Sequence, residues 1–252
     1  RLDRIVSAGL LVRHGEPQRH PEYRLTECGL DLWSSFIAMW QWESHWGTGV
    51  VQGALEHDRP RNRLIHLSCG EAIDPIFACS HCKSAVIPFD TVGRYESFIF
   101  QDVTRSAGRK RARKVRSDAR GELPTLLRVY GDRWNSLLMG AAFQGIKTFS
   151  EFELATGISP GPLSDRLEEL LSLGLLRSQA YAGVRREYRL TKASIAMFPI
   201  TVELIHWGNR WLWEGKPPMY VEHNSCGNRL ETQWLCSHCN QALKRTTVRF
   251  SA

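Results

Sequence analysis

Apolar residues recur every three or four positions in several stretches of the chain, which is the period of an amphipathic helix. The clearest stretch covers residues 159–173, where Ser159 suits the N-cap and Pro160 the first helical position. Its leucines fall on one face and are expected to pack inward: Leu163, Leu167, Leu170 and Leu171. The polar residues between them are expected to face outward: Ser164, Asp165, Arg166 and Glu169.

The same period predicts further helices over residues 27–46, 123–142, 149–156 and 192–211. Pro199 interrupts the last of these helices. Residues 175–181 and 185–190, joined by a turn at Ala182-Gly183, predict a β-hairpin. Short strands are predicted within residues 85–101, where apolar and polar residues are mixed.

One five-residue phrase occurs twice. Glu22–Thr26 reads Glu-Tyr-Arg-Leu-Thr, and Glu187–Thr191 repeats it 165 residues later. The match extends upstream at the same offset, from Arg1–Leu11 to Arg166–Leu176. A helix, a glycine stop and both hairpin strands are therefore predicted twice. Because the first copy begins inside its helix, we expect that residues before Arg1 are missing from the sequence.

A short helix, a turn at Gly157 and the helix over residues 159–173 predict a helix-turn-helix, whose second helix enters the major groove of DNA. The hairpin would then be a wing beside the DNA backbone. The candidate contacts are Ser159, Ser164 and Arg166 on the helix, Arg185 and Arg186 on the wing, and Arg1, Arg4, Arg19 and His20 in the first copy. The alternative is a small α+β domain whose surface polar residues bind nothing.

Several ordered motifs resemble those of HxlR-type bacterial transcriptional regulators. They are residues 131–138, 149–152, 157–159, 163–167, 174–175 and 187–191, and Trp207-Gly208. The resemblance covers roughly residues 121–213 and implies a winged helix-turn-helix that binds operator DNA as a dimer through its terminal helices. It also implies that Ser159, Gly161, Leu163, Ser164 and Arg166 lie on the recognition helix and Arg185 and Arg186 on the wing. Unlike the usual single-domain members, this chain carries two copies and could form its own pseudo-dimer.

Six of the seven cysteines fall in two clusters of identical spacing, offset by 157 residues. Each cluster reads His-x2-Cys-x9-Cys-x2-Cys, and three thiolates with one imidazole suit a closed tetrahedral zinc site. The sequence therefore predicts two structural zinc ions, one in each cluster. The proposed ligands are His66, Cys69, Cys79 and Cys82 in the first cluster and His223, Cys226, Cys236 and Cys239 in the second. Buried free thiols and a redox switch remain the alternatives.

Composition changes this picture little. A formal charge of +7 and a pI near 9.2 favour a polyanionic partner, although they also suit solubility or an acidic membrane surface. The paired cysteine clusters favour metal binding in a reducing cytoplasm, and no apolar run predicts a membrane span. Phosphate loops, nucleophile elbows and paired-carboxylate motifs are missing from the sequence, so we expect no enzymatic activity.

The predicted fold class is α+β, mainly helical, with two winged helix-turn-helix units, each followed by a small Cys/His zinc-binding lobe. The predicted parts are residues 1–57 (first unit, N-terminal part missing), 58–101 (first lobe), 102–120 (basic linker), 121–216 (second, complete unit) and 217–252 (second lobe). The predicted function is a sequence-specific regulator that binds double-stranded DNA, as an intramolecular pseudo-dimer or a homodimer, with a small-molecule effector left open. The alternative is a zinc or redox sensor, or a scaffold, acting through protein contacts.

Overall fold

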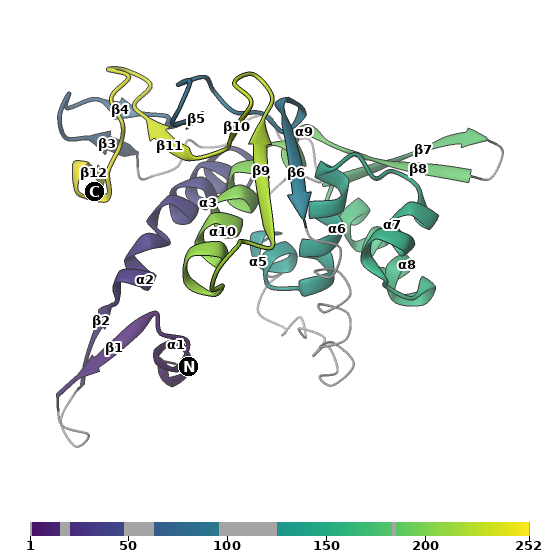
Figure 1. Ribbon diagram of the computed structural model, residues 1–252, viewed down its shortest axis with the longest axis horizontal. Helices are drawn as coiled ribbons and strands as arrows, with labels where there is room; N and C mark the ends of the chain where they lie inside the picture. Colours follow the sequence, from purple (N-terminus) through teal and green to yellow (C-terminus); the bar gives the residue numbers. More distant parts are fainter. Residues whose placement is uncertain (1, 16–20, 48–62, 96–124, 183–184, 252) are drawn as a thin grey trace.

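The structure is a computed structural model that describes residues 2–15, 21–47, 63–95, 125–182 and 185–251 (Figure 1). Its first half contains α1 (Leu2–Ser7), β1 (Leu11–His14), β2 (Glu22–Leu25), α2 (Glu27–Asp31), α3 (Trp33–Trp46), β3 (Leu64–His66), β4 (Ala72–Ile73), β5 (Ile76–Cys79), η2 (Pro88–Asp90) and β6 (Thr91–Tyr95). No helix among the described residues is both long and apolar enough to cross a membrane.

The second half begins with a complete winged helix-turn-helix and ends with the strands of the second cysteine cluster. Its elements are α5 (Thr125–Tyr130), α6 (Arg133–Phe143), α7 (Phe149–Thr156), α8 (Pro160–Ser172), β7 (Leu176–Ala182), β8 (Arg185–Leu190), α9 (Lys192–Ile195), α10 (Phe198–Trp211), β9 (Met219–His223), β10 (Asn228–Arg229), β11 (Thr232–Leu235), η3 (Arg245–Thr247) and β12 (Val248–Phe250).

Capping chemistry sets the boundaries of the helices in this unit. The single helix expected over residues 123–142 is two helices, because the Asp132 side chain accepts hydrogen bonds from the backbone N–H groups of Trp134 and Asn135 and so starts α6. Gly157 ends α7 in the left-handed conformation, with φ of 66°, and turns the chain into α8. Pro199 lies in the first turn of α10, so it begins that helix rather than interrupting a longer one.

The first copy has the same local structure as the second from its helix to its closing helix. Gly9 and Gly174 both have positive φ, 73° and 66°. The Thr26 hydroxyl donates to the Gly9 carbonyl oxygen, and the Thr191 hydroxyl donates to that of Gly174. In the first copy, the described residues begin at α1, the counterpart of α8.

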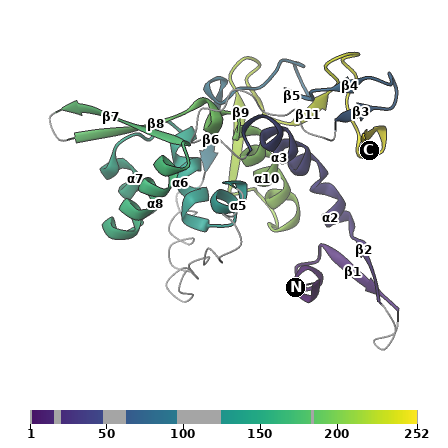
Figure 2. The ribbon, with the colours of Figure 1, turned by 180° about the vertical axis from the view of Figure 1, so that it is seen from behind.

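The closing helices α3 and α10 pack against each other at the centre of the molecule (Figures 1 and 2). Two hydrogen bonds cross between the copies in reciprocal fashion. The Trp42 indole N–H donates to the Ala193 carbonyl at 2.8 Å, and the Trp207 indole N–H donates to the Cys28 carbonyl at 2.9 Å. Since Trp42 corresponds to Trp207 and Cys28 to Ala193, each copy makes the same hydrogen bond to the other.

The segments that carry the two cysteine clusters are intertwined. Strand β5 pairs with β11, β6 with β9 and β12 with β3, and in every case one strand comes from each segment. Strands of two to five residues form a stable sheet only with additional partners, which the other segment provides. The expectation of two separate lobes is therefore wrong for the strands, which form shared sheets.

Candidate nucleic-acid interface and metal centres

The N-terminal half of α8 presents an open polar face. Ser159 and Ser164 are exposed, and in the described part of the chain no atom outside the helix's own backbone lies within 4 Å of a Cβ built on Gly161. The Ser159 side chain makes no capping hydrogen bond to its own helix, so this hydroxyl is not needed to hold α8 in place. The opposite face is anchored as predicted, with Leu163 and Leu167 buried in the core. Ser159, Gly161 and Ser164 can therefore contact a partner without disturbing the fold.

Arg166, expected on the same outward face, points instead toward α6. Its guanidinium donates to the Asp132 carboxylate at 2.8 Å and to the Glu169 carboxylate at 2.9 Å, and its side chain is only 23% exposed. Glu169 also accepts hydrogen bonds from Arg128 and Asn135. Arg166 and Glu169 thus hold α8 against α5 and α6. The sequence prediction placed both side chains wrongly because helical period alone cannot reveal a charged partner on a neighbouring helix.

The wing is a two-stranded hairpin fixed to the start of α7. The Tyr188 backbone N–H donates to the Lys147 carbonyl at 2.7 Å, and the Tyr188 ring packs edge-on against Phe152. Arg186 is exposed on β8, as predicted, and Arg185 is the first residue of the same strand. Arg177 on β7 is also exposed, and the sequence analysis did not single it out.

In the first copy, Arg4 is exposed on α1, the helix that corresponds to α8. The other candidates of this copy, Arg1, Arg19 and His20, lie outside the described residues.

All eight predicted ligands come together in two groups, but the division differs from the prediction. The first group consists of His66 and Cys69 from the first segment with Cys236 and Cys239 from the second. The second group consists of Cys79 and Cys82 from the first segment with His223 and Cys226 from the second. Each group therefore takes a His-x2-Cys arm from one segment and a Cys-x2-Cys arm from the other.

The distances in both groups fit a tetrahedral zinc site. With Zn–S of about 2.3 Å and Zn–N of about 2.05 Å, ligand atoms lie about 3.8 Å apart for S···S and about 3.6 Å for S···N. In the first group, His66 Nδ1 lies 3.4 Å from Cys69 Sγ and 3.3 Å from Cys239 Sγ, and Cys69 Sγ lies 3.8 Å from Cys236 Sγ.

The second group has the same dimensions. His223 Nδ1 lies 3.5 Å from the Sγ atoms of both Cys82 and Cys226, and Cys79 Sγ lies 3.9 Å from Cys226 Sγ. The buried Nε2 of His223 lies 3.1 Å from the Asp90 carboxylate, which also accepts a hydrogen bond from Ser225. A carboxylate behind a histidine fixes the ring for ligation through its other nitrogen. Backbone hydrogen bonding from Asn228 also lowers the pKa of Cys226 to about 6, which favours the thiolate.

Local backbone geometry adapts both Cys-x2-Cys arms to a common centre. The residues that follow them, Lys83 and Asn240, have positive φ of 64° and 58°, and their N–H groups donate to the carbonyls of Cys79 and Cys236. This tight turn brings two thiols to one point. His81 is outside both groups, and its Nε2 instead lies 3.9 Å from Glu231.

Known proteins resemble this chain in the region of the helix-turn-helix. Residues 129–216 match the HxlR-like helix-turn-helix family. An uncharacterised HTH-type transcriptional regulator of Mycobacterium tuberculosis is 34% identical over 125 residues, which cover 48% of this chain and 79% of the relative. The chain belongs to the HxlR-like helix-turn-helix family. The predicted family is therefore confirmed. The prediction that the protein is a DNA-binding transcriptional regulator, and not an enzyme, is confirmed with it.

Other similar proteins have the same general description. A regulator of Mycobacterium bovis is 33% identical over 125 residues, covering 48% of this chain and 79% of its own. A crystal structure described as a candidate transcription factor is 28% identical, with a TM-score of 0.45 over 50% of this chain and 90% of that one. A second such structure, from Pseudomonas aeruginosa, is 24% identical with a TM-score of 0.40, covering 48% of this chain and 84% of that one.

Proposed function

We propose that this HxlR-like protein regulates transcription by inserting α8 into the major groove of an operator, with the β7–β8 wing along the adjoining backbone. The observation that carries the proposal is the open face of α8, where Ser159 and Ser164 are exposed and Gly161 leaves room for close approach. Exposed Arg177 and Arg186 on the wing supply cations for phosphate. Arg166 is assigned to holding α8 in place.

We further propose that one chain presents two readers as a pseudo-dimer. The reciprocal hydrogen bonds of Trp42 and Trp207 and the strands exchanged between the cysteine segments support this arrangement. Helix-turn-helix dimers bind two half-sites about one DNA turn apart, so the exposed Arg4 on α1 would face the second half-site.

Fluorescence anisotropy with a labelled duplex from the region upstream of the gene tests both statements. We expect saturable binding that resists excess unrelated DNA, with one chain bound per palindromic site. Binding of two chains per site would favour a homodimer over the pseudo-dimer. Failure to saturate at about 1 μM protein in low salt would contradict operator binding.

The two ligand groups are proposed to hold structural zinc, two ions per chain. Both have closed sets of three thiolates and one imidazole at tetrahedral spacing, without an open position for substrate. Since each group joins both segments, each ion would link the two copies of the chain. Elemental analysis of reduced protein purified without chelator should find about two zinc ions per chain, and metal-free, fully folded protein would contradict the assignment.

Zinc or oxidant sensing by the same centres is the second candidate. It is favoured by the partial exposure of four ligand cysteines, Cys69, Cys82, Cys226 and Cys239, which oxidants could reach. Peroxide titration separates the two roles. Zinc release accompanied by loss of operator affinity would support sensing, whereas retention of metal and affinity would leave zinc with a structural role only.

A further inference from the structure

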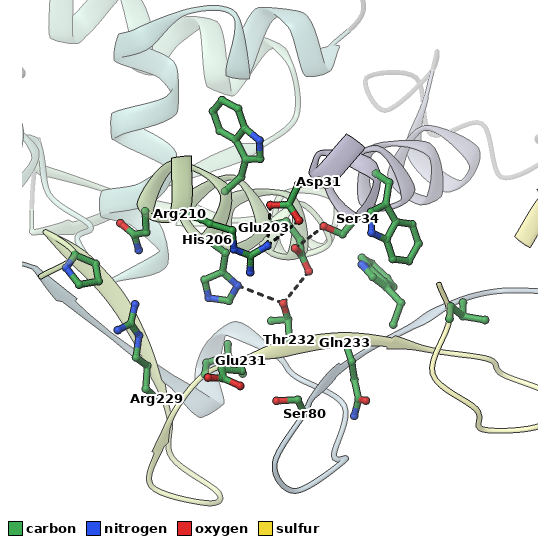
Figure 3. Close-up of a pocket in the computed structure, with 17 residues that line it drawn as sticks. Asp31, Ser34, Ser80, Glu203, His206, Arg210, Arg229, Glu231, Thr232 and Gln233 are labelled. Atoms are coloured by element: carbon green, nitrogen blue, oxygen red, sulfur yellow. Dashed lines mark hydrogen bonds and ion pairs between the residues drawn. The ribbon is translucent and has the colours of Figure 1, made fainter. Parts of the chain in front are cut away.

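A cavity of about 710 Å³ lies between the closing helices and the strands of the second cysteine segment, with Ser80 of the first segment also in its lining (Figure 3). This volume is within the range of small-molecule sites. Both copies contribute to its polar wall: Asp31 and Ser34 from the first, and Glu203, His206, Arg210 and Thr232 from the second.

The polar wall contains one charged group that is costly to bury. Glu203 is only 6% exposed and accepts hydrogen bonds from Ser34 at 2.8 Å and Thr232 at 2.9 Å. Burial raises the pKa of its carboxyl group. Beside it, Arg210 donates to both oxygens of Asp31, at 2.7 and 2.8 Å. Replacing a buried charged group such as Glu203 with an apolar one of similar shape is often neutral or stabilising, so packing alone gives little reason for it.

The chain provides its own comparison, because the other copy builds the same framework without these charges. At the offsets of 165 for the helices and 157 for the strands, Glu203, His206, Arg210, Arg229 and Thr232 correspond to Ala38, Gln41, His45, Ala72 and Pro75. In the first copy, Gln41 donates to the Pro75 carbonyl at 2.8 Å. At the corresponding place in the second copy, His206 Nδ1 lies 3.3 Å from the Thr232 hydroxyl oxygen. The backbone arrangement therefore does not require the charged set.

His206 lies at one end of the cavity, close enough to Arg229 and Arg210 to be affected by their charges. Burial, together with the nearby charges of Arg229 and Arg210, lowers the pKa of His206 to about 4, against the opposing effect of Glu231. Asp31 is already paired with Arg210, and the Glu231 side chain is 72% exposed. Arg229 lies over the Tyr220 ring at 5.2 Å and lines the cavity. An anionic group beside Arg229 and His206 would therefore be stabilised.

The remaining wall offers aromatic surface and a donor. Trp33, Trp207 and Trp234 all line the cavity. The Trp234 ring is buried, and among the described residues its indole N–H has no hydrogen-bond partner. An unpaired buried donor is costly, and packing within the described residues leaves this N–H unsatisfied.

We propose that this cavity binds a small planar aromatic carboxylate, with the carboxylate beside Arg229 and His206 and the ring against the tryptophans. Because its walls come from both copies, an occupied cavity fixes how the copies lie against each other. Binding thereby changes operator affinity, a consequence that rests on the proposed function.

Calorimetric titration of the full-length, zinc-loaded protein tests binding without DNA. The probes are 2-naphthoate, 2-naphthamide and 2-naphthylmethylamine, which share one ring system and differ in charge. We expect 2-naphthoate to bind with a dissociation constant below about 1 mM and the other two at least about tenfold more weakly. Equal affinity for all three, or no heat from 2-naphthoate at about 5 mM, would overturn the proposal.

Two variants locate the binding site. Arg229→Gln and His206→Gln, the second of which installs the residue of the other copy, should each weaken 2-naphthoate binding at least about fivefold. Arg249→Gln removes an exposed arginine from β12 and should leave binding unchanged. Unaltered binding in both cavity variants, with melting curves that show folded protein, would place the ligand elsewhere and overturn the assignment.

Anisotropy with the operator duplex completes the test. A change of at least about threefold in operator affinity on adding 2-naphthoate to the wild type, but not to Arg229→Gln, supports coupling of the two sites. If 2-naphthoate binds but no duplex does, the regulatory function fails while the ligand site stands. If the duplex binds but 2-naphthoate does not, only the ligand site fails.

Discussion

Arg166 and Ser164 lie two positions apart on α8 and have different environments. Ser164 is exposed, and among the described residues its side chain has no partner that holds the fold, whereas Arg166 connects the cap of α6 to Glu169. An amphipathic pattern assigns both residues to the polar side of the helix. The difference between them is decided by Asp132, whose carboxylate both caps α6 and accepts from Arg166. Substitution of Ser164 should therefore affect DNA binding, and substitution of Arg166 should affect stability.

Arg166→Gln is expected to lower the free energy of unfolding by about 1–3 kcal/mol, because Asp132 and Glu169 lose a partly buried cation. Ser164→Ala should leave stability within about 0.5 kcal/mol of the wild type but weaken operator binding. Urea titrations and anisotropy measure the two effects. Ser172→Ala, at the far end of the same helix, is the control for binding. If Arg166→Gln were as stable as the wild type but no longer bound DNA, Arg166 would be a DNA contact rather than a structural residue.

His206 gives a stability effect that depends on pH. Its pKa is lowered to about 4 by burial and by Arg229 and Arg210, whereas an unfolded histidine titrates near 6.5. Below pH 6.5 the unfolded chain thus binds a proton that the folded chain does not, so stability present above pH 6.5 is lost as the pH falls toward 4. Between pH 6.5 and 4.5 the wild type should lose about 2 kcal/mol more than His206→Gln.

Urea unfolding at several pH values measures that difference. His45→Gln, an exposed histidine on the corresponding helix of the first copy, is the matched control and should follow the wild type. Loss of metal at low pH would affect all three proteins alike and cancels in the comparison. Parallel curves for wild type and His206→Gln would mean that His206 is protonated in the folded protein.

The wing shows which secondary-structure elements could be predicted. Turn chemistry and alternation placed both hairpins, because strand period and glycine stops are local properties of the sequence. The division of residues 123–142 into α5 and α6 depends on Asp132, a local cap that the apolar pattern hides. The exchange of strands between cysteine segments was beyond reach, since the two segments have the same spacing and either pairing satisfies it.

Removing the wing arginines should weaken DNA binding without regard to sequence. Arg185→Ala combined with Arg186→Ala is expected to lower affinity equally for operator and unrelated duplexes, because phosphate contacts carry no sequence information. The slope of log affinity against log salt should fall by about 1–2, or about 0.9 for each lost contact. Arg245→Ala combined with Arg249→Ala removes two exposed arginines near the C-terminus as the charge-matched control. If both double variants lowered DNA affinity equally, the wing arginines would act only through the net charge of the protein and not as phosphate contacts.

At the scale of the whole molecule, the division of ligands between the segments decides what the proposed zinc ions would connect. If zinc bound within each segment, the ions would stabilise two small lobes independently. With the observed division, each centre bridges residues more than 140 positions apart, as in the 3.5 Å approach of Cys82 Sγ to His223 Nδ1. Closing such long loops strongly restricts the unfolded chain. The metal centres and the Trp42 and Trp207 bonds would then hold the same pair of copies together.

Pairwise substitution distinguishes the two divisions by counting metal. Cys69 and Cys239 belong to one centre in the structure, so the double variant Cys69→Ser with Cys239→Ser should lose one zinc ion per chain and retain the other. Cys69 and Cys82 belong to different centres, so Cys69→Ser with Cys82→Ser should lose both. Binding within each segment predicts the opposite result for each pair. Both doubles remove two thiolates, so elemental analysis compares equal chemical changes, and Cys28→Ser, outside both groups, is the control that should keep both ions. Because each ion would add a link between the copies, the variant that loses both ions should also melt at the lower temperature of the two.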